Sequence, residues 1–182
     1  MQTHIILQSL CFALQKFYSK DYKKSKKIGR RGTERASVFR IAHYLANIIE
    51  NNEIFEGLNI DNEYSKSEID KDKKVIYTTG EEGRAIPDLI IHKRGKKNTK
   101  YNLLYCEFKI NDEENNDIEK LKFFTFDENY KYNLGIFISI KDVIKDIKNN
   151  ICPLNSCLFF KNGKELAKDK IYMLQDNLEI IV

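Results

Sequence analysis

Two acidic residues and a lysine lie within two hydrophobic segments, where core strands normally carry no charge. Asp88 precedes the apolar residues 89–91, and Glu107 and Lys109 stand two positions apart in the segment 103–110. A wholly buried carboxylate costs on the order of several kcal/mol unless it is paired or bound to a metal. Two converging carboxylates can hold a divalent cation, and a lysine beside them can position or deprotonate water. We therefore place the candidate catalytic chemistry at these three residues.

Both segments have the composition of β-strands. They are rich in β-branched, aromatic and aliphatic residues and are separated by Gly95 and a polar run, so they predict a β-hairpin. Because side chains alternate across a strand, Asp88 shares a face with Ile90, and Glu107 shares a face with Lys109. We expect Asp88 and Glu107 to converge on that face. The opposite face, which we expect to pack against helices, carries Leu89, Ile91, Cys106, Phe108 and Ile110.

A third acid is predicted to reach the same place from a helix. Thr33 can cap a helix that extends to about residue 51. One step of four residues before its buried stripe lies Glu34, which could therefore lean over the sheet toward Asp88. In the alternative interpretation, Glu34 is an acid in the first turn that interacts favourably with the helix dipole and has no role in the site. The buried stripe consists of Val38, Ile41, Leu45 and Ile48.

The remaining periodicity predicts an α/β chain with a mixed central sheet. Residues 58–64 alternate and predict a first strand, and the apolar run 134–140 is typical of a central strand covered on both faces. Asn116 and Asp117 can cap a helix between these strands, and Lys120 on that helix is either a basic site residue or a solvated lysine. Further predicted elements are a helix at 3–18, a short strand at 75–77, a turn at 80–84, a helix at 141–149 and strands at 158–160 and 178–182.

The motif Pro87-Asp88 on one strand and Glu107-Phe108-Lys109 on the next resembles the PD-(D/E)XK nuclease superfamily. The wider pattern is similar to that of a group of small prokaryotic proteins of uncharacterised role within it, over residues 33–140. Leu89, Lys93 and Phe108 depart from the commoner residues of that group, but no charged position is lost. The matching residues are Glu34-Arg35, Glu63-Tyr64, Pro87 to Gly95, Asn102-Leu103-Leu104, Glu107 and Lys109.

This resemblance implies a restriction-endonuclease-like core and a metal-dependent endonuclease. Asp88, Glu107 and Glu34 are then the expected ligands of Mg²⁺, with Mn²⁺ as an alternative, and Lys109 is the expected fourth catalytic residue. Lys120 fits the basic residue that superfamily members often supply from the following helix. Cleavage would leave a 5′-phosphate and a 3′-hydroxyl, and DNA is the expected substrate, although the sequence does not distinguish DNA from RNA.

A dense basic run precedes the helix that carries Glu34. Each phosphate contact made by Lys or Arg adds sequence-independent affinity for nucleic acid, whereas the alternative is a solvated loop. We expect nucleic-acid contacts here. The predicted contact residues in this run are Lys23, Lys24, Lys26, Lys27, Arg30 and Arg31.

The chain of 182 residues carries a formal net charge of +4 and 42% hydrophobic residues, which suits a single domain. We divide it into a helical, basic extension at 1–32, a core at 33–140 and a C-terminal helix and strands at 141–182. Four cysteines without zinc-type spacing and no apolar run of about 20 residues predict a cytoplasmic protein without a membrane span. We expect the N-terminal helix to pack on the domain, and a homodimer contact through this helix is the alternative.

Two other interpretations compete with an enzyme. A catalytically silent nuclease fold could bind nucleic acid or a protein partner, although carboxylates that repel phosphate would not help such a binder. A plain α/β interaction domain would need the hairpin charges, the helix glutamate and the basic run to coincide by chance. Asp88 and Glu107 on opposite sides of the sheet would establish this last interpretation.

Overall fold

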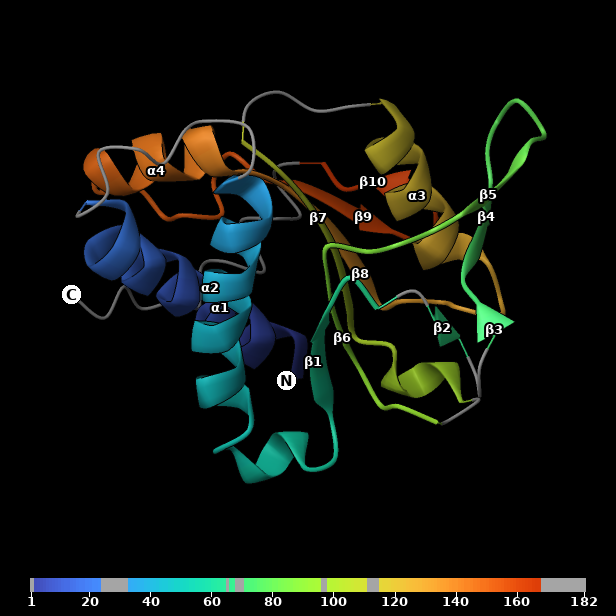
Figure 1. Cartoon of the computed structure of the whole chain (residues 1–182), viewed down its shortest axis with the longest axis horizontal. Helices are drawn as coiled ribbons and strands as arrows, with labels where there is room; N and C mark the ends of the chain where they lie inside the picture. The colour runs from blue at the N-terminus through green and yellow to red at the C-terminus, as the bar shows by residue number, and fades with distance from the viewer. Residues whose placement is uncertain are drawn as a thin grey trace.

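The computed structural model describes residues 2–23, 33–64, 66–67, 71–95, 98–110 and 115–167 (Figure 1). Its centre is a six-stranded sheet in the order β1-β6-β7-β8-β9-β10. Strands β7 and β8 are parallel, and the other neighbouring pairs are antiparallel, which confirms the predicted mixed sheet. The strands are β1 (Asn59–Asn62), β6 (Leu89–His92), β7 (Leu104–Lys109), β8 (Leu134–Ser139), β9 (Leu158–Lys161) and β10 (Lys164–Glu165).

Helices cover both faces of this sheet. Figure 1 shows α1, α2 and α4 on one side and α3 on the other, and the buried residues form two clusters that divide in the same way. No helix in the described ranges is both long and apolar enough to cross a bilayer. The helices are α1 (Gln2–Phe17), α2 (Thr33–Ile49), α3 (Asn115–Phe126) and α4 (Ile140–Lys148), with a π-helix η1 (Tyr18–Tyr22) and 3-10 helices η2 (Glu53–Phe55) and η3 (Thr99–Tyr101).

The elements that build the centre follow one another as α2, β1, β6, β7, α3 and β8. Three antiparallel strands are thus followed by a helix and a strand parallel to the third, because a parallel pair needs a crossover connection. Two small two-stranded sheets are inserted between β1 and β6. They pair β2 (Lys66–Ser67) with β3 (Lys71–Asp72) and β4 (Lys74–Ile76) with β5 (Glu82–Arg84).

The predicted hairpin and its two faces are confirmed. In the β6–β7 ladder, Ile90 lies opposite Tyr105, and both belong to the cluster beneath α3. The Tyr105 ring stacks on Phe124 of α3 with the ring centroids 4.6 Å apart. The intervening residues Leu89, Ile91, Cys106 and Phe108 pack in the cluster beneath α1, α2 and α4.

Two sequence expectations differ from the structure, and a third lies outside the described residues. The turn predicted at 80–84 was wrong in part, because residues 82–84 form β5. A Cβ atom at Gly83 would lie 2.7 Å from the Tyr77 ring, so this glycine permits close packing and does not mark a turn. In α2, Ile49 is buried whereas the predicted Ile48 is only partly buried. The strand predicted at 178–182 lies outside the described residues.

A buried ion cluster joins β1 to the end of β6. His92 Nε2 lies 2.8 Å from Asp61 Oδ2, and the Arg94 guanidinium forms two hydrogen bonds to the same carboxylate. Burial raises the pKa of Asp61, but its bonds to His92 and Arg94 outweigh this effect and lower the pKa from 3.8 to about 2. The cluster therefore stabilises the β1–β6 edge, and that contribution is lost only as the pH falls from about 4 toward 2.

Candidate active site

The hairpin brings the two predicted carboxylates together. Asp88 stands just before β6, and its Oδ2 accepts a hydrogen bond of 2.7 Å from the backbone N–H of Phe108, the residue after Glu107. Glu107 on β7 is only 2% exposed, and its Oε1 accepts a bond of 3.1 Å from the Tyr105 hydroxyl. The charge of Asp88 also acts on the pKa of Glu107. The two carboxylates thus act on each other, and the opposite-side arrangement that would establish a plain interaction domain is not found for Asp88 and Glu107.

Helix α3 places a lysine and a further acid against Glu107. Lys120 Nζ donates to Glu107 Oε1 at 3.2 Å and to Asp117 Oδ1 at 2.7 Å. The sequence indicates Asp117 only as a helix cap, whereas its side chain is buried in the structure. The sequence feature that predicts the burial of Asp117 is its spacing, because it stands four residues before the buried Leu121 on the inward stripe of α3.

Lys109 connects Asp117 to Glu34, the third predicted acid. Its Nζ lies 3.2 Å from Asp117 Oδ2 and 3.9 Å from Glu34 Oε1. Glu34, in the first turn of α2, also accepts a hydrogen bond of 3.3 Å from the backbone N–H of Ile110 at Oε2. The structure therefore places Glu34 over the end of β7, as the helical stripe predicted.

Burial dominates the electrostatics of this cluster. It raises the pKa of Asp88, and the Glu34 charge raises it further, against the Phe108 N–H and the two lysines. Burial also raises the pKa of Glu107, although Lys120 opposes that shift. Burial alone would lower the pKa of Lys120, but Glu107 and Asp117 raise it above its usual value of 10.5. We take Lys120 as cationic, because two carboxylates contact it.

The acidic side chains of the cluster are of the chemical type that hard divalent cations bind. Four carboxylates, from Asp88, Glu107, Glu34 and Asp117, face two lysines, so acidic groups are in excess, and carboxylate oxygen is what Mg²⁺ and Mn²⁺ prefer. Asp117 Oδ2 is buried, and it lies 3.2 Å from Lys109 Nζ in an ion pair. Across those residues, no three His, Cys, Asp or Glu side chains are arranged to enclose an ion. A cation bound to Glu107 would therefore compete with Lys120.

The predicted nucleic-acid contacts are only partly described. Lys23 is exposed at the end of η1, with its Nζ 5.1 Å from the centroid of the Tyr18 ring. The other residues of the basic run, Lys24, Lys26, Lys27, Arg30 and Arg31, lie outside the described residues. Lys120 is part of the carboxylate cluster and is not a solvated lysine.

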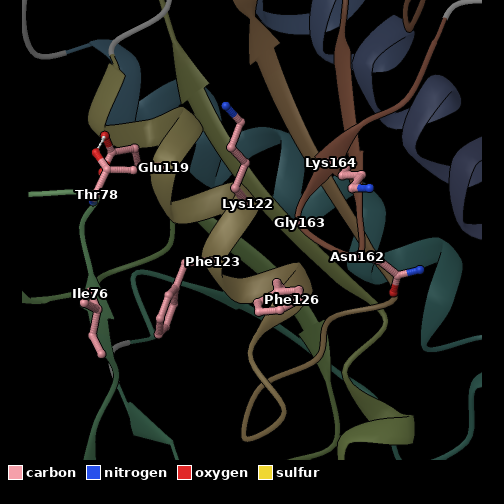
Figure 2. A pocket seen from close by; sticks show the side chains of 9 residues that line it. All are labelled: Ile76, Thr78, Glu119, Lys122, Phe123, Phe126, Asn162, Gly163 and Lys164. Carbon is pink, nitrogen blue, oxygen red and sulfur yellow. Dashed lines mark hydrogen bonds between the residues drawn. The ribbon is translucent and has the colours of Figure 1, made fainter. Parts of the chain in front are cut away.

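One of two pockets adjoins the carboxylate cluster, and the other lies apart from it. A pocket of about 210 Å³ adjoins Asp88 and is lined by Arg35, Val38, Phe39, Asn62, Glu63 and Asp88. A pocket of about 310 Å³ lies between α3, β4 and the β9–β10 turn. Figure 2 shows Phe123 of α3 on the side of Ile76, and Phe126 on the side of Asn162. None of the predicted site residues lines the second pocket.

No family model, curated protein or solved structure matches this chain.

Proposed function

We propose that the chain is a metal-dependent endonuclease that hydrolyses phosphodiester bonds, with DNA as the expected substrate. The observation that carries this proposal is the convergence of Asp88, Glu107, Lys109 and Glu34, which come from the hairpin and from α2, in one contact network. Pro87-Asp88 lies directly before β6, and Glu107-Phe108-Lys109 lies on β7, its antiparallel neighbour. This order supports the resemblance to the PD-(D/E)XK superfamily and a restriction-endonuclease-like core.

The cluster offers each function that phosphodiester hydrolysis needs. Asp88 and Glu107, with Glu34 beside them, are the residues that would hold Mg²⁺ or Mn²⁺. Such a cation, when bound, stabilises charge on the phosphate and lowers the pKa of a bound water. Lys109, held between two carboxylates at the end of β7, can orient the attacking water or stabilise the phosphorane charge. Lys120 fixes the rotamer of Glu107 through its ammonium group.

One observation favours a second candidate, a nuclease fold that only binds nucleic acid or a protein partner. Lys120 already forms ion pairs with Glu107 and Asp117, so the charges can serve a purely structural role. The two candidates differ in whether the carboxylates ever exchange a lysine for a metal ion.

A cleavage assay distinguishes the two candidates. Supercoiled plasmid, linear duplex and single-stranded DNA would be incubated with the protein in Mg²⁺, in Mn²⁺ and in EDTA. We expect cleavage only with metal, products with 5′-phosphate and 3′-hydroxyl ends, and loss of cleavage in Lys109→Ala. Salt-sensitive binding without cleavage under any condition would instead establish the binding module.

A further inference from the structure

The pocket beside Asp88 combines an exposed aromatic ring with a polar wall. Phe39 is 62% exposed although it lies on α2 next to the buried Val38, and both residues line the pocket with Asp88. Arg35 stands one helical turn before Phe39, so its guanidinium and the Phe39 ring lie on the same side of α2. An aromatic face and a guanidinium plane are both surfaces on which a nucleobase can stack.

The other wall of this pocket is held by specific bonds. Glu63 forms an ion pair of 2.7 Å with Arg35, and its backbone has a positive φ of 50°. Asn62 donates a hydrogen bond of 3.1 Å from Nδ2 to the backbone carbonyl of Asp88. A non-glycine residue in the left-handed region is uncommon and is found most often where the surroundings require it. The Asn62 bond ties this wall to the backbone of Asp88, whereas the Arg35–Glu63 ion pair is exposed to solvent.

Charge and size restrict what the pocket can accept. Two carboxylates, Glu63 and Asp88, and one cation, Arg35, line the pocket, so an uncharged group fits its charge better than a phosphate does. Its volume of about 210 Å³ lies below the roughly 300–1,000 Å³ of sites for drug-sized ligands. This suits one flat ring system. A base within a duplex has both faces covered by its neighbours, so it must leave the stack to enter.

We infer that this pocket receives one unpaired nucleobase next to the cleaved phosphate, stacked on Phe39, so that single-stranded or locally unpaired DNA is preferred over intact duplex. The inference rests on the proposed function and names its substrate class.

The absence of tryptophan from the chain makes stacking directly measurable. Phe39→Trp places the chain's single tryptophan in the pocket, and Phe126→Trp provides a matched control, because Phe126 is 64% exposed in the other pocket (Figure 2). Each variant would be titrated with a single-stranded oligonucleotide and with a blunt duplex of the same sequence, in EDTA and in Mg²⁺. Thermal melts would show that both variants are folded.

We expect single-stranded DNA to quench Phe39→Trp at a lower concentration than duplex and to leave Phe126→Trp nearly unchanged. Phe39→Ala should weaken binding of single-stranded DNA by about five- to a hundredfold, the worth of one stacked base. Equal quenching of both variants, quenching by duplex as effective as by single strands, or no quenching in either buffer overturns the inference. Quenching by a protein that cuts no substrate would instead refute the proposed activity and leave the pocket assignment standing.

Discussion

Replacing Asp88 by asparagine should lower the rate of DNA cleavage by at least about a hundredfold, because loss of a metal ligand removes several kcal/mol of transition-state stabilisation. The protein should stay folded, and its melting temperature should hold or rise. Asparagine Oδ1 can still accept the bond from Phe108 N–H, while the burial penalty and the repulsion from Glu34 that act on Asp88 disappear. Single-turnover cleavage and thermal melts on the same preparation measure both effects.

The matched control for Asp88→Asn is Glu119→Gln. Glu119 lies on α3, but its carboxylate binds Thr78 outside the cluster, so the control should cut at the wild-type rate. If Asp88→Asn cut as fast as Glu119→Gln, the carboxylate at position 88 would have no part in the reaction.

Replacing Lys120 by methionine should destabilise the metal-free protein by roughly 3–5 kcal/mol, because Glu107 and Asp117 would lose the cation that lies between them. Denaturant unfolding at neutral pH measures this loss. A buried acid with a raised pKa holds more protons in the folded state, so stability falls as the pH rises above the usual glutamate pKa of 4.5. The deficit of Lys120→Met should therefore shrink toward pH 4.

Lys122→Met is the control for Lys120→Met, because Lys122 is exposed two residues later on α3, and it should change stability little. Adding Glu107→Gln to Lys120→Met should recover part of the loss. Mn²⁺ should stabilise Lys120→Met more than the wild type, since no ammonium then competes for Glu107. Equal stability of the Lys120 and Lys122 variants would show that the ion pairs do not support the fold.

Alternating patterns predicted the hairpin and its two faces well. Period-two alternation reports side-chain direction directly, so the burial of Leu89, Ile91, Cys106 and Phe108 against helices followed from the sequence. The packing of Ile90 and Tyr105 beneath α3 did not. The position of Glu34 followed in the same way from the helical stripe of α2. Both predictions depended only on the geometry of a single element.

Contacts between elements were harder to predict. Asp117 was assigned to a cap because the sequence alone does not show which first-turn acid a neighbouring strand will cover, although its place on the buried stripe of α3 was visible. Gly83 was assigned to a turn because its packing against Tyr77 depends on the pairing of β4 with β5. The partnership of Lys120 with Glu107 likewise arises only when α3 crosses β7.

The most direct test of a divalent-cation site at Asp88 and Glu107 is a Mn²⁺ titration followed by electron paramagnetic resonance. Wild-type protein should bind Mn²⁺, and Asp88→Asn and Glu107→Gln should each weaken that binding at least about tenfold, whereas Glu119→Gln should bind like the wild type. Binding that is unaffected by both site variants, or no binding by the wild type, would contradict the assignment of these carboxylates as a metal site.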